Sequence, residues 1–306
     1  MFRIHNSILV MLATILTFLS LSDTTFGQLS DSVAWTATAA DQYEITPNIT
    51  YLTVNNWDAK LDLYQPVHSK EQSPTLIWIH GGGWTRSSKE TEMLYILPYL
   101  ELGWTVISVE YRLARVSLAP AAVEDCRCAL RWVIANAPKY KIDTGKIVLS
   151  GISAGGHLAL TTGILPTSAG LDRQCSGSEE LKVAAIINWF GPSDIGDLLE
   201  GTHAFDQAIS WFGSQPNRDE IAKRVSPITY IRQGLPPIIT IHGDKDDAVP
   251  YSQSVKLHQA LDKANVPNQL VTIRGGGHGD FKREEWLRAY AAIREFIVKN
   301  GIMKRK

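Results

Sequence analysis

Downstream of residue 48, short apolar runs rich in β-branched residues alternate with longer segments whose apolar residues recur at helical spacing. The short runs are typical of strands buried on both faces, because such strands show no alternation of apolar and polar residues. They predict strands at residues 75–80, 104–110, 146–150, 184–189, 237–242 and 269–274. The longer segments predict helices at residues 90–102, 121–136, 154–165, 252–264 and 282–299.

Two earlier runs, at residues 49–54 and 59–64, resemble an antiparallel hairpin and complete a predicted set of eight strands. Alternating strands and helices favour an α/β fold in which a mostly parallel eight-stranded sheet carries helices on both faces. No internal repeat and no Pro- or Gly-rich linker divides the chain, so we expect a single domain at residues 49–306. Residues 28–48 lack apolar periodicity and are predicted to form a mobile lead-in.

The first 27 residues have the pattern of a secretory signal peptide. Arg3 supplies a positive charge, residues 8–21 form an apolar stretch, and the small residues Thr25 and Gly27 suit a signal peptidase. The stretch is too short to span a bilayer, which takes about 20 apolar residues. An uncleaved anchor and a buried first helix are the alternatives. Cleavage predicts a secreted or periplasmic protein, and no later segment is long and apolar enough to span a membrane.

Composition excludes several classes of protein and partner. With 306 residues, 44% apolar and 20% charged, the chain is not collagen-like, coiled-coil or wholly disordered. Thirty basic and 31 acidic residues give a net charge of −1, which offers no electrostatic argument for a nucleic-acid partner. Three cysteines are too few for a disulfide framework or a Cys-rich metal site. A single bridge to Cys175 from Cys126 or Cys128 and buried free thiols both remain open.

The strongest local signal for chemistry is GISAGG, residues 151–156, which follows a predicted strand and opens a predicted helix. A nucleophile on such a sharp turn takes a strained backbone conformation and needs small neighbours two residues before and after it. Gly151 and Gly155 meet that requirement, so Ser153 is the candidate nucleophile at the positive end of the helix dipole. An incidental Gly-Ser turn is the alternative reading.

A second motif, HGGGW at residues 80–84, directly follows another predicted strand. Consecutive glycines expose backbone N–H groups that are fixed before negative charge develops on a bound ester. We therefore predict an oxyanion hole formed by the N–H groups of Gly82, Gly83 and Ala154. Cradling of a pyrophosphate is the competing use of such loops, but this segment lacks both GxGxxG and a Walker lysine.

Two later segments, HGDKDDAVP at residues 242–250 and GGGHG at residues 275–279, also follow predicted strands. The carboxyl ends of parallel strands share one edge of the sheet, where open α/β folds place their sites. A serine needs a base and the base needs an orienting acid, and the order Ser153, Asp246, His278 suits a hydrolase triad. Asp244 and Asp247 lie in the same loop and compete with Asp246, Asp247 being the second choice.

The remaining histidines of interest have structural interpretations. We expect His80 to orient its loop by a hydrogen bond, His157 to pack inside the helix that follows Ser153, and His242 to brace the acid loop. A metal site formed by these three is an alternative, but the chain shows no ligand spacing such as HExxH. We predict no metal.

Together the four motifs resemble the α/β-hydrolase esterases of the hormone-sensitive-lipase type, and especially the secreted bacterial carboxylesterases and feruloyl- or acetylxylan-esterase-like (BD-FAE-like) proteins. The resemblance covers roughly residues 49–299. It implies the α/β-hydrolase fold and serine-ester hydrolysis without metal or organic cofactor, and its HGxxDxxVP pattern puts the acid at Asp246. One departure is visible, because the family's YRLAPE run reads YRLARV at residues 111–116.

Substrate-pocket residues are harder to assign. Trp84 follows the oxyanion glycines and is predicted to wall the acyl pocket, with a core-covering role as the alternative. Residues 201–214 occupy a connection that often forms a cap in this fold, so Phe205, Trp211 and Phe212 either shape the substrate site or pack a helix.

The expected function is a secreted serine esterase that acts on a small-molecule or polysaccharide-linked ester. Acetylated or feruloylated carbohydrates are candidate substrates. A serine peptidase of the prolyl-oligopeptidase type shares the triad order, but this chain has no room for a propeller. A non-catalytic hydrolase-fold binding module is the third reading, and such modules commonly lose triad residues. Sequence alone does not identify the ester or the oligomeric state.

Overall fold

The computed structural model describes residues 36–37, 39–69 and 71–304. It comprises two units, Met1–Tyr43 and Glu44–Lys306. In the first unit, residues 36–37 and 39–42 are helical, and the predicted signal peptide lies outside the described residues. Among the helices of the described ranges, none combines the length and the apolar character needed to cross a membrane. All features described below belong to the second unit, except Tyr43, with which the first strand begins.

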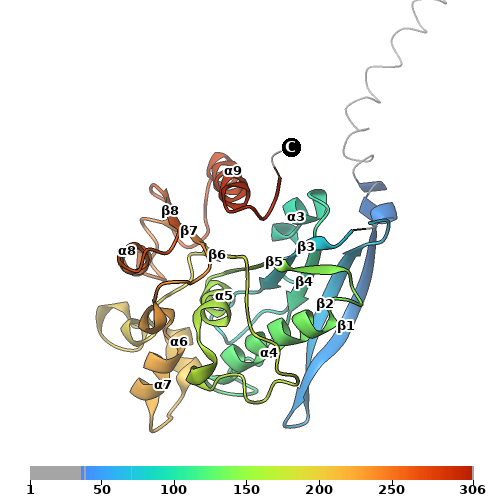
Figure 1. Ribbon diagram of the computed structural model, residues 1–306. Coiled ribbons are helices and arrows are strands. Elements are labelled where there is room, and N and C mark those ends of the chain that lie inside the picture. Colours follow the sequence, from blue (N-terminus) through green and yellow to red (C-terminus); the bar gives the residue numbers. More distant parts are fainter. Residues whose placement is uncertain (1–35, 38, 70, 305–306) are drawn as a thin grey trace, which may run out of the picture. The chain divides into compact units, whose positions relative to one another are not determined.

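An eight-stranded sheet, in the order β1-β2-β4-β3-β5-β6-β7-β8, organises this unit (Figure 1). Strand β2 runs antiparallel to β4, with Leu61 opposite Val109, whereas the pairs from β4 through β8 are parallel. The predicted mostly parallel sheet is therefore confirmed. The strands are β1 Tyr43–Val54, β2 Trp57–Pro66, β3 Ser73–Ile79, β4 Thr105–Val109, β5 Ile142–Ile152, β6 Ala185–Trp189, β7 Ile238–Gly243 and β8 Asn268–Ile273.

Burial explains which strands the apolar pattern predicted well. Every residue of β4, β6 and β7 is buried, as expected for strands covered on both faces. Strand β1 is mostly exposed and begins at Tyr43, so the lead-in predicted for residues 28–48 was wrong for its last part. An exposed edge strand has no apolar pattern to reveal it. Asn55 and Asn56, both with positive φ, make the tight turn from β1 into β2.

Helices lie on both faces of the sheet: α4 and α5 on one, α3 and α9 on the other (Figure 1). The α-helices are α3 Leu97–Glu101, α4 Ala121–Asn136, α5 Ala154–Ile164, α6 Asp206–Phe212, α7 Arg218–Val225, α8 Tyr251–Lys263 and α9 Arg283–Lys299. Short 3-10 helices occur at Met93–Tyr95, Thr167–Ala169, Gly196–Leu198, Gly201–His203 and Pro227–Tyr230.

The predicted helix at residues 90–102 was wrong in extent, because the segment contains only a 3-10 turn and the short α3. Pro98 stands in the first turn of α3, where its missing N–H is tolerated, and cannot continue a helix from upstream. Gly103 follows the end of α3 with a positive φ. Helix α7 was not predicted because it is too short to show a clear period, whereas α6 lies within residues 201–214, where a packed helix was one of the two readings.

The cysteines divide into a bridge and a free thiol. Cys128 of α4 forms a disulfide with Cys175, 47 residues further along the chain. Cys126 is buried and free. Because residues two apart on a helix face different sides, only one of the pair reaches Cys175. Of the alternatives left open by the sequence, the structure contains the single bridge to Cys175, formed by Cys128.

Candidate active site

Ser153 stands at the sharp turn between β5 and α5. Its φ of 52° and ψ of −121° lie in a region that L-residues rarely occupy, a strained conformation that costs on the order of 1–3 kcal/mol. Gly155 has to be glycine, because a Cβ there would collide with the backbone carbonyls of Ile79 and His80. The strand-to-turn-to-helix geometry inferred from GISAGG is thus the one the chain adopts.

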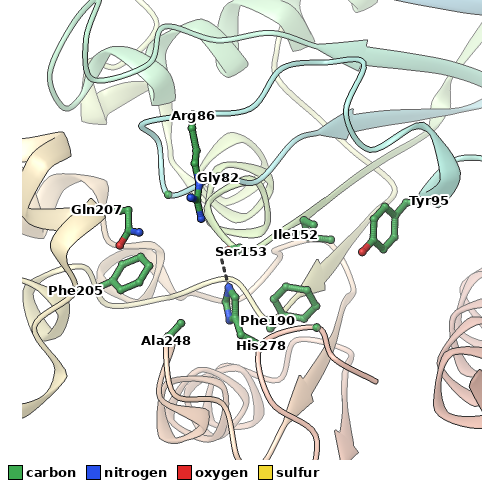
Figure 2. Close-up of a pocket in the computed structure, with 12 residues that line it drawn as sticks. Gly82, Arg86, Tyr95, Ile152, Ser153, Phe190, Phe205, Gln207, Ala248 and His278 are labelled. Atoms are coloured by element: carbon green, nitrogen blue, oxygen red, sulfur yellow. Dashed lines mark hydrogen bonds between the residues drawn. The ribbon is translucent and has the colours of Figure 1, made fainter. Parts of the chain in front are cut away.

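Three side chains that are far apart in sequence meet beside this turn. Ser153 Oγ lies 2.8 Å from His278 Nε2, and His278 Nδ1 lies 2.7 Å from Asp246 Oδ2 (Figure 2 shows the first of these bonds). The Asp246 side chain is fully buried, whereas 23% of the His278 side chain is exposed toward the pocket. The structure therefore brings together the three residues predicted as nucleophile, base and acid.

Asp246 is held as an anion by several donors. Its Oδ1 accepts the N–H groups of Ala248 and Val249, at 2.9 and 2.8 Å, and its Oδ2 also accepts His242 Nε2 at 3.1 Å. Burial alone would raise the pKa of Asp246, but the hydrogen bonds from His242 and His278 outweigh it and hold this pKa well below its usual value. A carboxylate so fixed can orient the His278 imidazole and stabilise its protonated form.

The other aspartates of the loop have different surroundings. Asp244 Oδ1 accepts the Gly275 N–H at 2.7 Å, which ties the acid loop to the loop that carries His278. Asp247 is exposed. Of the three candidate acids, only Asp246 contacts the imidazole among the described residues, which agrees with the sequence-based choice.

The glycine loop at residues 80–84, here called the oxyanion loop, lies across the pocket from His278. Gly82 and Gly83 have φ values of 98° and 61°, and both line the pocket together with Ser153. A Cβ on Gly83 would come within 2.6 Å of Gln207 Cβ, so a larger residue would displace the loop or α6. Ala154 opens α5, where first-turn N–H groups have no partner within the helix. Gly82 and Gly83 thus line the pocket with Ser153, and the third predicted donor, Ala154, directly follows the serine.

Two buried side chains that the sequence analysis did not single out hold this loop. Glu92 Oε1 accepts the Gly81 N–H at 2.9 Å. The Tyr111 hydroxyl contacts the carbonyl oxygens of His80 and Gly81 at 3.0 and 3.1 Å, and its ring stacks on His80. His80 Nδ1 donates to the Gly81 carbonyl. The family-like YRLA run was the available signal for Tyr111, whereas nothing in the pattern pointed to Glu92.

The prediction that Trp84 walls the acyl pocket was wrong. Its indole is 1% exposed, stacks on Trp211 with ring centroids 4.6 Å apart, and donates to His157 Nδ1 at 3.2 Å. His157 Nε2 in turn donates to the Val225 carbonyl at 2.7 Å. Trp84 therefore fills the core beneath the loop, which was the alternative reading, and His157 has the packed role expected of it.

A pocket of about 310 Å³ opens in front of Ser153 (Figure 2). Phe205 and Gln207, from the connection that holds α6, form one wall, while Trp211 and Phe212 of α6 are buried. The segment at residues 201–214 therefore shapes the pocket through Phe205 and also packs a helix into the core through Trp211 and Phe212. The lining residues are Gly82, Gly83, Arg86, Tyr95, Ile152, Ser153, Phe190, Phe205, Gln207, Ala248, His278 and Gly279.

His242 occupies the bracing position expected from the sequence. Its Nε2 donates to Asp246 and to the Val249 carbonyl, and its Nδ1 lies 2.6 Å from Ser254 Oγ. His80, His157 and His242 each have separate partners. Within residues 36–37, 39–69 and 71–304, no group of three or more His, Cys, Asp or Glu side chains is arranged to hold a metal ion.

Comparison with known proteins places these features in a family. The BD-FAE family model matches residues 61–261. Esterase LipC of Mycobacterium tuberculosis is 27% identical over a match that covers 68% of this chain and 53% of LipC. The chain thus spans about half the length of such curated relatives.

Solved structures match over a larger share of their length. A truncated carbohydrate esterase from gut microbiota is 28% identical, with a TM-score of 0.69 and coverage of 84% of this chain and 97% of that one. Propionate-bound esterase Est2 of the planctomycete Thermogutta terrifontis is also 28% identical, with a TM-score of 0.72 and coverage of 87% and 97%. The fold described above is therefore that of esterases with the α/β-hydrolase architecture.

Proposed function

The chain belongs to the BD-FAE family, and from this premise we propose that it is a serine esterase that hydrolyses carboxylic esters through an acyl-enzyme. The observation that carries the proposal is the hydrogen-bonded series Ser153–His278–Asp246 at the mouth of a pocket lined by Gly82 and Gly83. A nucleophile, a base, an orienting acid and N–H donors for an oxyanion are the parts that acyl transfer needs.

Acylation begins when Ser153 Oγ attacks the ester carbonyl and its proton passes to His278 Nε2. The carbonyl electron pair moves to oxygen, and the N–H groups of Gly82, Gly83 and Ala154 stabilise the resulting oxyanion. Asp246 holds the imidazole in the tautomer that accepts this proton and stabilises the imidazolium. Collapse of the intermediate breaks the bond to the alcohol, which leaves with the proton from His278.

Deacylation repeats these steps with water. His278 takes a proton from the water as its oxygen attacks the acyl carbon, and the same donors hold the second oxyanion. Collapse releases the carboxylic acid and returns the proton to Ser153. The chain's own residues therefore account for every proton in the cycle.

The decisive test is Ser153→Ala assayed on p-nitrophenyl acetate. Turnover should fall by roughly 10^6, because the members of a triad act as a unit. Ser252→Ala, at an exposed serine of α8, is the matched control and should keep wild-type turnover. A fluorophosphonate should label the wild type and the control but not Ser153→Ala. Near wild-type turnover without Ser153 would end the proposal, and a lack of labelling in the wild type would favour a binding module.

We further propose that the substrate is an ester of modest size, with acetylated or feruloylated carbohydrate as the candidate class. The likeness to a carbohydrate esterase of gut microbiota and to a propionate-bound esterase supports this choice. A panel of acetyl, butyryl, octanoyl and feruloyl esters, with acetylated xylan, tests it. A matched aminoacyl amide and ester distinguish the peptidase alternative, for which the amide should be cleaved at a comparable rate.

Secretion is also a proposal, supported by the charged, apolar and small-residue pattern of residues 1–27. Expression of the full chain in a bacterial host should yield an exported form that starts near residue 28. N-terminal sequencing of the exported protein measures this start. An intact Met1 on protein that stays in the cytoplasm would contradict the proposal.

A further inference from the structure

One charged side chain in the pocket has no part in the mechanism above. Among the described residues that line the pocket, Arg86 is the only one with a permanent charge. Its backbone N–H bonds to the Gly82 carbonyl at 3.2 Å, which fixes Arg86 next to the oxyanion loop. Figure 2 shows its side chain extending from this loop past Gly82 toward Ser153.

Among the described residues, none balances the charge of Arg86. Lys89, three residues further on, is buried and pairs with Asp62 at 3.0 Å and with Glu90. For the Arg86 guanidinium, the described part of the chain provides neither a hydrogen bond nor an ion pair. The carboxylate of the triad, Asp246, already receives four hydrogen bonds. The pocket therefore presents an unpaired cation beside the reacting serine.

Hydrolysis of a neutral ester needs no such cation, because the oxyanion is served by backbone N–H groups. A guanidinium fork can bind a carboxylate through two parallel N–H···O bonds, and a carboxylate is an anionic group that an ester substrate commonly carries. Gln207, on the wall formed by α6, adds an amide whose N–H groups face the same pocket. Arg86 and Gln207 thus offer two kinds of donor to one anionic group.

We propose that Arg86 selects esters that carry a free carboxylate near the scissile bond, such as O-acyl esters on the hydroxyl groups of uronic acids or half-esters of dicarboxylic acids. This inference rests on the proposed esterase function and narrows its substrate class. Arg86 is exposed at the mouth, so water and salt screen its charge and the preference is moderate. A charge-assisted hydrogen bond in such a place corresponds to a preference of about tenfold.

The test uses two pairs of esters that differ only in charge. One pair is 4-acetoxybenzoate and 4-acetoxybenzamide, with the carboxylate on the alcohol side. The other is monomethyl adipate and methyl adipamate, with the carboxylate on the acyl side. The readout is the ratio of kcat/KM for the anionic and neutral members, because this ratio cancels any general loss of activity in a variant.

In at least one pair, Arg86→Gln should lower the ratio about tenfold relative to wild type. Arg86→Lys, which keeps the charge but loses the fork, should give an intermediate ratio. Arg173→Gln is the control, since Arg173 is exposed outside the pocket and its loss changes the net charge equally. Raising NaCl to about 0.5 M should shrink the wild-type preference.

An unchanged ratio in both pairs for Arg86→Gln would overturn the inference, as would an equal fall for Arg173→Gln. Failure of the esterase proposal is distinguishable, because it would appear as absent Ser153-dependent hydrolysis of the neutral esters. Which pair responds also assigns the carboxylate to the alcohol side or to the acyl side of the substrate.

Discussion

Glu92 accepts the backbone N–H of Gly81 at 2.9 Å, so a buried carboxylate holds the first glycine of the oxyanion loop. Its other oxygen accepts Trp78 Nε1 at 3.1 Å. Burial raises the pKa of Glu92 to about 7, and the hydrogen bonds from Gly81 and Trp78 offset only part of that rise. The acid that positions the loop therefore titrates close to neutral pH.

Glu92→Gln should weaken both the loop and the fold. A glutamine has one acceptor oxygen for two donors, so either Gly81 or Trp78 is left unpaired, at a cost of about 1–3 kcal/mol. We expect a similar loss in the free energy of unfolding, measured with denaturant, and about a tenfold fall in kcat on a neutral ester. Glu90→Gln, at an exposed neighbour, is the control and should keep wild-type kcat.

The raised pKa of Glu92 should also make the free energy of unfolding depend on pH. Because the pKa of Glu92 is raised from 4.5 to about 7 by folding, the folded state binds the extra proton between these values. Its contribution to stability is complete below pH 4.5 and is lost as pH rises through 7. Glu92→Gln should remove this decline from unfolding curves measured across that range. A variant curve parallel to the wild-type curve would show that Glu92 does not titrate there.

Asp246→Asn should lower kcat by roughly 10^4, because an amide can leave His278 in the wrong tautomer while preserving the shape of the site. The neighbouring Asp247→Asn removes the same charge from an exposed position and should keep kcat near wild type. Steady-state rates on p-nitrophenyl acetate measure both. The reverse outcome, with Asp247 essential and Asp246 dispensable, would refute the geometry of the acid loop.

Loss of the bridge between Cys128 and Cys175 should affect stability and not catalysis. Closing a loop of 47 residues stabilises a protein by about 4 kcal/mol through the entropy of the unfolded chain. The double variant Cys128→Ala/Cys175→Ala should therefore unfold at lower denaturant concentration, with kcat retained because neither cysteine lines the pocket. Reduced wild type should match the double variant, and a wild type indifferent to reductant would argue against the bridge.

Much of this architecture was predictable from local patterns. Buried strands such as β6 and β7 carry unbroken apolar runs, and α4 begins and ends where its periodicity does. The turn at Ser153 was predictable because its backbone conformation requires small flanking residues, and the GISAGG motif supplies them. Asp246 could be preferred over its neighbours only through the family-like register of its loop.

Other features could not be predicted because they depend on contacts between distant segments. The first half of strand β1, residues 43–48, has no buried residue, so pairing at the sheet edge and not apolar patterning defines it. Trp84 was assigned to the pocket because it follows the oxyanion glycines, yet the T-shaped and stacked contacts with His157 and Trp211 draw it into the core. No local signal indicates which buried residues meet in this way.

The sequence by itself determined the order of strands and helices, the strained turn at Ser153 and the kinds of residue at the sheet edge, because each follows from short-range sterics and periodicity. Only the tertiary structure decided that Glu92 accepts a hydrogen bond from the oxyanion loop and that Cys128, not Cys126, pairs with Cys175. It also decided that Arg86 faces the pocket with no partner among the residues that the structure describes. Those outcomes depend on which surfaces the folded chain brings together, and that information is not present in any single segment.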